Sequence, residues 1–370
     1  MEASARKSHP TIQESFPAAP GVWGVKTAFV NLYFIAEPDG SWVLVDAGLY
    51  GYKQKIKKAV VELFGEDARP RAILLTHGHF DHIGSLRELA AEWRVPVYAH
   101  PLEFPYLTGK SNYPPPDASV GGGGMAYMAF MYPKKPIDVS NNLELLPPDG
   151  SVPGLPSWRW LHTPGHTAGH VSFFRESDRT LVAGDAFITR DGESLAAVLS
   201  QKRKVHGPPA YFTSDWGAAQ HSVELLADLN PEIAATGHGL PMRGKELQSQ
   251  LYQLVQDFWM VAVPDHGRYV HEPAVTDEMG VVSVPPPVSN PVPKVLAVAG
   301  AVALAGIALA ALRNRKAAKH PRYAASGAFR EQEAKPLQHR PFSHNRVATG
   351  LPPDIDPNYD DPNGHTNNYP

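Results

Sequence analysis

Cysteine is absent from the 370-residue sequence. Its absence excludes disulfide bonds, a thiolate nucleophile and any metal site with a cysteine ligand. An excess of charge of one sign is also missing, because 34 Lys and Arg side chains stand against 37 Asp and Glu side chains. A chain so close to neutral lacks the excess of positive charge that is typical of nucleic-acid-binding proteins. We therefore expect no nucleic-acid partner.

The N-terminal residues lack the apolar run of a secretory signal. Residues 1–20 are polar, and we expect them to be flexible. From Val22 the pattern predicts strands at 30–36, 42–46, 72–75, 97–99, 158–162, 171–174 and 181–183. Four longer segments predict helices at 52–64, 83–93, 214–229 and 245–260. Strands followed by helices, in two successive sets, predict two packed sheets flanked by helices.

The composition changes near residue 283. Residues 283–294 are rich in proline and are expected to form a semi-rigid linker. Residues 295–312 carry no charged or polar side chain, and as an α-helix they would be about 27 Å long. That length is close to the ~30 Å hydrocarbon core of a bilayer, so we expect a single transmembrane helix, with a buried or interfacial helix as the alternative. The polar tail, 313–370, has the composition of a disordered segment.

Two signals about the orientation of this membrane anchor conflict. Basic residues crowd the segment from Arg313 to Arg322, whereas Lys294 stands alone on the other flank. The positive-inside rule would place the tail in the cytoplasm and the folded domain outside. The lack of an N-terminal signal argues against export of a domain of this size. We expect a single-pass, membrane-anchored protein, with the side that carries the folded domain left open.

The strongest chemical signal is the run Thr76-His77-Gly78-His79-Phe80-Asp81-His82. Imidazole and carboxylate groups together suit zinc and other borderline divalent ions. His77 and His79 alternate in an extended segment and can hold one ion, whereas Asp81 and His82 stand at the turn into a helix and can reach a second. A surface histidine cluster is the competing interpretation. The position of the run directly after a buried strand favours a metal site.

One loop cannot complete two coordination shells, and the chain supplies further candidates. His166 lies in a glycine-punctuated loop between strands, Asp185 follows a strand, and His238 follows another. A lone His or Asp of this kind is more often structural. Three of them, each at a strand end beside a glycine, indicate a site assembled along one rim of a sandwich.

Taken in order, these motifs resemble those of the metallo-β-lactamase fold superfamily, from about Val22 to Met242. Within it, the chain looks like the glyoxalase-II-like and uncharacterised bacterial metallo-hydrolases. Asp46-Ala47-Gly48 resembles the first motif, and the later motifs match the candidates above, namely His77 to His82, His166, Asp185 and His238. The resemblance implies an α/β (α+β) fold over residues 21–282, built as a four-layer αββα sandwich with the metals at one edge.

The same resemblance implies which residues hold which ion. It places His77, His79 and His166 on one metal. It places Asp81, His82 and His238 on the other, with Asp185 between the two ions. It makes Asp46 a supporting residue rather than a ligand. Two Zn²⁺ ions are the expected cofactors, with iron or manganese as alternatives.

Metal chemistry then predicts a dinuclear zinc hydrolase. A water that bridges two divalent ions has its pKa lowered to roughly 7, and the hydroxide can attack an ester, thioester or lactone carbonyl. Asp81 is the candidate catalytic residue that orients the nucleophile or carries a proton. Alternatives are a mononuclear iron oxidoreductase like the sulfur dioxygenases, a β-lactam hydrolase without a cysteine ligand, and a non-catalytic binding protein. Retention of all seven ligands favours two metals and catalysis.

Three residues in two loops are candidates for contact with a small-molecule substrate. Arg268 could hold a carboxylate in a bidentate contact. Tyr211 or Tyr269 could stabilise an oxyanion. Packing of these loops against the sandwich is the competing interpretation. The sequence names neither the substrate nor the oligomeric state.

Overall fold

The computed structural model describes residues 14–121, 126, 129, 132–133, 136–190 and 203–288. Chain contacts define two units, Met1–Ala299 and Gly300–Pro370, and all described residues belong to the first. The predicted transmembrane helix at 295–312 and the disordered tail at 313–370 lie outside the described residues. So do the first 13 residues of the predicted flexible N-terminus and the linker from 289 onward. These four assignments stay predictions.

The first sheet holds seven strands that follow one another in sequence order. An antiparallel meander forms its first half, with β1 (Ser15–Ala19), β2 (Val22–Thr27), β3 (Val30–Ala36) and β4 (Trp42–Val45). Parallel strands form the second half, with β5 (Ile73–Leu74), β6 (Val97–Ala99) and β7 (Leu143–Leu145). Parallel neighbours need crossovers, and these contain α1 (Lys53–Phe64), α2 (Phe80–Ile83) and α3 (Leu86–Trp93).

The second sheet has the strand order β12-β11-β10-β9-β8. Its strands are β8 (Trp158–His162), β9 (Val171–Arg175), β10 (Thr180–Gly184), β11 (Ile233–Thr236) and β12 (Met242–Arg243). The β10–β11 pair is parallel, and α7 (Trp216–Asp228) lies in the connection between them. The chain continues from β12 through α8 (Gly244–Gln256) and α9 (Phe258–Val261) to a hairpin of β13 (Val275–Asp277) and β14 (Gly280–Ser283).

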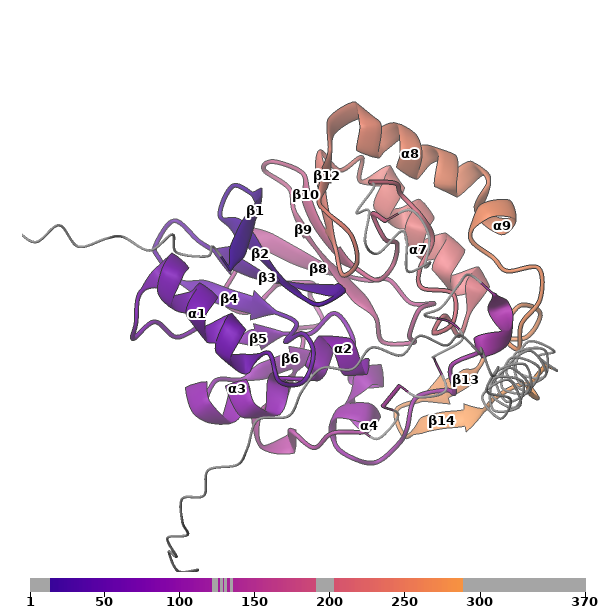
Figure 1. The fold of residues 1–370 in the computed structure, drawn as a ribbon, viewed down its shortest axis with the longest axis horizontal. Helices are drawn as coiled ribbons and strands as arrows, with labels where there is room; N and C mark the ends of the chain where they lie inside the picture. The colour runs from indigo at the N-terminus through magenta and orange to yellow at the C-terminus, as the bar shows by residue number, and fades with distance from the viewer. Residues whose placement is uncertain are drawn as a thin grey trace, which may run out of the picture. The chain divides into compact units, whose positions relative to one another are not determined.

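Three buried clusters show how these layers pack. Ile56 of α1 and Leu89 of α3 join residues of the first sheet in one cluster. Val45 of the first sheet and Phe173 of the second share another, so the two sheets pack face to face. A third joins the second sheet to α7 and α8. The order helix, sheet, sheet, helix is visible in Figure 1 and agrees with the predicted four-layer αββα sandwich.

Short irregular elements lie in the crossover from β6 to β7. They are η1 (Pro101–Glu103), α4 (Phe104–Leu107), η2 (Ala118–Val120) and η4 (Ser140–Asn142). Across the described part of the chain, no helix is both long and apolar enough to span a bilayer.

The structure corrects the predicted N-terminal boundary of the domain. Residues 15–19, assigned to the flexible N-terminus, form β1 at the edge of the first sheet. The pairing is specific, because the Phe16 ring covers Gly24 so closely that a Cβ there would lie 2.2 Å from it. Ser15 Oγ also donates to Glu62 on α1. These contacts are made by residues far along the chain, so local composition did not reveal them.

Phe173 tests the packing between the two sheets. It is fully buried in the cluster that the sheets share. Phe173→Ala should lower the free energy of unfolding by about 3–5 kcal/mol, because it removes a ring and leaves a cavity. Urea denaturation would measure the loss. Leu225→Ala on α7, where the side chain is 41% exposed, is the matched control and should change stability little.

Candidate metal centre

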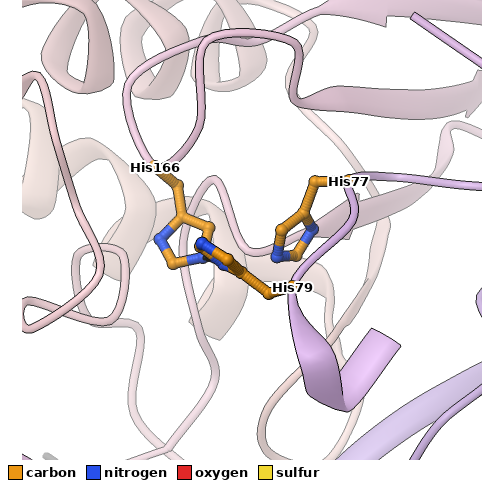
Figure 2. Close-up of side chains that lie close together, drawn as sticks. All are labelled: His77, His79 and His166. Carbon is orange, nitrogen blue, oxygen red and sulfur yellow. Dashed lines mark hydrogen bonds between the residues drawn. The ribbon is translucent and has the colours of Figure 1, made fainter. Parts of the chain in front are cut away.

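One edge of the sandwich gathers the predicted ligands from both sheets. The segment after β5 carries His77 and His79, and α2 begins at Phe80, so that Asp81 and His82 lie in its first turn. His166 lies in the loop between β8 and β9, Asp185 directly follows β10, and His238 follows β11. Figure 2 shows His77, His79 and His166 pointing toward one another from two separate segments.

The structure brings all seven predicted ligands together in a buried cluster. Each is no more than 5% exposed. Three groups have potential ligand atoms within 4.8 Å of one another, namely His77 with His79 and His166, His77 with His82 and Asp185, and Asp81 with His82 and His238. Groups of this composition and spacing can each hold a divalent ion.

Asp185 lies between the two predicted triads. Its Oδ2 is 3.5 Å from His166 Nε2, 3.5 Å from His82 Nε2 and 3.1 Å from His238 Nε2. This approach requires Gly237, because a Cβ at that position would lie 2.1 Å from Asp185 Oδ1. The carboxylate can therefore reach an ion in either triad.

Hydrogen bonds fix which ring nitrogen of His77 and of His238 faces the cluster. His77 Nδ1 donates to Thr76 Oγ1 at 3.0 Å, because that hydroxyl already donates to Asp46. His238 Nδ1 donates to the carbonyl oxygen of Phe29 at 2.9 Å. In both residues the Nε2 lone pair is left for the interior of the cluster. Protein metal sites commonly orient their histidines in this way.

Three atoms of the cluster have no hydrogen-bond partner among the described residues. They are His77 Nε2, His82 Nε2 and Asp185 Oδ1, and all three are buried. A buried polar atom without a partner costs roughly 1–3 kcal/mol. Metal ions accept electron pairs from these atom types, so the donor set fits such a group. The roles of the seven residues as ligands stay a prediction.

Asp46, predicted to support the ligands, contacts His82 directly and His77 through Thr76. Its Oδ1 accepts from the Thr76 amide at 2.8 Å. Its Oδ2 accepts from Thr76 Oγ1 and from His82 Nδ1, both at 2.8 Å. The residue has a φ of 62°, a left-handed conformation that Asp tolerates better than most residues. This backbone geometry aims the carboxylate at the segment that carries His77 and at the ring of His82.

The cluster divides into neutral and charged imidazoles. Burial and the neighbouring imidazoles lower the pKa values of His77 and His166 well below the ordinary range, and burial lowers that of His79 to about 3. Burial also lowers the pKa of His82, but the carboxylates of Asp185, Asp46 and Asp81 outweigh it and raise that pKa well above its usual value. Without metal, His82 therefore carries a proton at neutral pH.

Glu103 is a supporting residue that the sequence did not reveal. It is fully buried at the end of η1. Its Oε2 accepts from the Gly78 amide at 2.9 Å and from the Tyr113 hydroxyl, and its Oε1 accepts from Thr167 Oγ1 at 2.7 Å and the Gly169 amide at 3.0 Å. One carboxylate thus joins the loop of His77 and His79 to the loop of His166. Burial raises its pKa despite these donors.

His170 supports the metal cluster from the side of the second sheet. Its Nε2 accepts from the backbone amide of Asp185 at 2.9 Å, and its Nδ1 donates to the carbonyl oxygen of Thr163 at 3.0 Å. Both ring nitrogens are therefore engaged with the protein. The ring orients Asp185 and is not itself a member of the ligand groups.

The three predicted substrate residues are found in packed loops. Tyr211 is buried, and its ring centroid is 4.8 Å from that of Phe212. Tyr269 donates its hydroxyl to the carbonyl oxygen of Pro115 at 2.7 Å, and the Arg268 guanidinium lies 5.9 Å from the centre of the Tyr269 ring. These positions agree with the competing interpretation that the loops pack against the sandwich. Contact of these residues with a substrate stays a prediction.

Comparison with known proteins identifies the family of the chain. Residues 25–238 match the sequence model of the metallo-beta-lactamase superfamily. Over 241 residues the chain is 48% identical to "Probable metallo-hydrolase YflN" of Bacillus subtilis (strain 168), a match that covers 65% of this chain and 91% of that protein. It is 29% identical over 210 residues to "Probable metallo-hydrolase YybB" of the same organism, with 57% and 80% coverage.

A solved structure with the same family description is also similar. It is a metallo-beta-lactamase family protein from Thermus thermophilus, 23% identical in sequence, with a TM-score of 0.46. The similarity covers 65% of this chain and 80% of that one.

Replacing Glu103 should loosen the metal loops. Glu103→Gln keeps the size of the side chain but turns one of its two acceptor oxygens into an NH₂ donor that faces other donors. We expect metal affinity to fall by about 10- to 100-fold and the free energy of unfolding to fall by about 1–3 kcal/mol. Zinc titration and urea denaturation would measure both. Glu144→Gln, at an exposed position on β7, is the control and should change neither quantity.

Metal binding near neutral pH should release a proton from His82. The raised pKa of His82 keeps it protonated in the metal-free protein, and a histidine must be neutral to bind a metal ion. Apparent zinc affinity should therefore rise with pH, by about tenfold per unit while His82 is the titrating group. Calorimetry in buffers of different ionisation enthalpy would count the released protons. Zinc binding without any proton release, at a pH below the pKa of His82, would contradict the assignment.

Proposed function

The chain belongs to the metallo-beta-lactamase superfamily and is a metal-dependent hydrolase, and from that premise we propose that it holds two zinc ions and cleaves an ester, thioester or lactone. One observation supports the proposal above the others. Seven buried imidazole and carboxylate side chains converge from both sheets, and their inward atoms include three with no hydrogen-bond partner in the described chain.

The bound ions would supply a hydroxide near neutral pH and would polarise the substrate carbonyl. His77, His79 and His166 would hold one ion, and Asp81, His82 and His238 the other. The side chains of His77, His82 and His238 are already oriented for this task, because Thr76, Asp46 and the carbonyl oxygen of Phe29 engage their outward nitrogens.

Asp81 is the proposed catalytic carboxylate. Its Oδ2 lies 3.5 Å from His238 Nε2, and burial raises its pKa above the ordinary value for aspartate. A carboxylate at the centre could accept a proton from the nucleophile and return it to the leaving group. His238 and His82 hold the pKa of Asp185 well below its usual range despite burial. Asp185 therefore stays ionised and would supply negative charge to the bound ions.

Asp185→Asn and His77→Ala test the proposal. Each removes a ligand atom from the centre, so hydrolysis of thioester, lactone and ester substrates should fall by at least about 100-fold. The circular dichroism spectrum should stay that of the parent. His221→Ala replaces an exposed histidine on α7 and should keep full activity.

Elemental analysis of the same proteins decides the number of ions. The parent chain should hold close to two zinc ions, and both ligand variants should hold fewer. Full activity in either variant would refute the ligand assignment. A single iron in the parent would instead favour oxygen-dependent chemistry on a thiol, and the hydrolytic proposal would be withdrawn.

A further inference from the structure

A large cavity opens beside the metal centre. Its volume is about 930 Å³, and its wall includes His79 together with residues of α2, α3 and α4, which are labelled in Figure 1. Ligand pockets for drug-sized molecules have volumes of roughly 300–1,000 Å³. Because protein interiors are otherwise closely packed, a space of this size next to a candidate reaction centre indicates a place for part of the substrate.

The cavity reaches the metal centre at His79. The ring of His79 contacts two aromatic rings of the cavity wall, with its centroid 4.6 Å from that of Tyr113 and 4.5 Å from that of Phe212. A second, smaller cavity touches His166 as well as His79 and shares Tyr113 and Phe212 with the large one. The two spaces are therefore neighbours across the same pair of aromatic residues.

The wall of the cavity is mainly apolar. Ile83, Ile137 and Ala91 contribute aliphatic surface, and four prolines contribute surface without an N–H donor. Among the described wall residues only Arg87 and Glu88 have a formal charge at neutral pH, leaving His79 aside, and both are exposed on α3. A charged substrate group would leave its water shell here and find no charged partner among the described wall residues other than these two, which is costly.

We propose that this cavity binds an apolar acyl chain of the substrate, so that the enzyme prefers medium- or long-chain carboxylic esters and thioesters over acetyl ones. The inference rests on the proposed hydrolytic function and names the substrate class of the same site. The scissile carbonyl would lie at His79 and its neighbours, and the chain would extend past Phe80 toward Ile137. Burial of each methylene group favours binding by about fourfold.

The kinetic test compares p-nitrophenyl acetate with p-nitrophenyl octanoate on the zinc-loaded full chain. The octanoate should have a kcat/KM at least about 100-fold higher, since six additional methylene groups would be buried. Ala91→Glu and Ile137→Asp should each lower that preference by at least about tenfold, because they place a charge in the apolar wall. Leu225→Asp, on the exposed surface of α7, is the matched control and should alter neither rate.

A binding measurement separates the cavity from the catalysis. Calorimetric titration with 1-octanol, a neutral apolar probe, should show saturable binding that Ala91→Glu and Ile137→Asp weaken by at least about tenfold. Ala91 is exposed on α3, so Ala91→Glu should fold normally. The measurement therefore still tests the cavity if Ile137→Asp fails to fold.

Two other combinations of results separate the cavity proposal from the proposed hydrolytic function. Equal rates for the two esters with no octanol binding would overturn the cavity proposal and leave the hydrolase standing. Hydrolysis of neither ester, with octanol binding that the two substitutions weaken, would support the cavity and count against the proposed hydrolytic function.

Discussion

The burial of seven ionisable side chains in one small volume is the constraint on which the rest of this structure depends. Unpaired buried charges and lone pairs are costly, and neighbouring imidazoles repel one another once protonated. Hydrogen bonds from groups around the cluster offset part of this cost. Thr76, Asp46 and the carbonyl oxygen of Phe29 bind the outer nitrogens of His77, His82 and His238, so that the inner nitrogens of these three rings face the cluster. The same bonds that lower the cost also set the direction of each ligand.

This constraint explains why the site lies at the edge of two sheets. His77 and His79 follow a strand of the first sheet, and Asp185 and His238 follow strands of the second. Each sheet alone would present only part of the set. The face-to-face packing of the sheets brings the parts together, and Glu103 connects the loop of the first sheet to a loop of the second. Stability of the sandwich and affinity for metal are therefore coupled.

Local sequence predicted the strands well where apolar runs were bounded by turn residues. The strands at 30–36, 97–99 and 158–162 occur with the predicted bounds. The helix expected at 83–93 is instead two short helices, Phe80–Ile83 and Leu86–Trp93, because Gly84 packs against the backbone of residues 48–50, where a Cβ would lie 2.1 Å from Tyr50 N. Such a contact between distant segments leaves no local signal.

The sequence by itself determined which chemical groups this protein can use. The spacing of histidines and carboxylates after buried strands names the candidate ligands, and the absence of cysteine removes the thiolate sites. Only the tertiary structure decided that Glu103 supports the ligand loops, that Tyr269 is engaged with Pro115, and that an apolar cavity begins at His79. The reason is physical. Ligand identity is a property of residue type and local spacing, whereas partners and empty space arise from contacts between segments far apart in the chain.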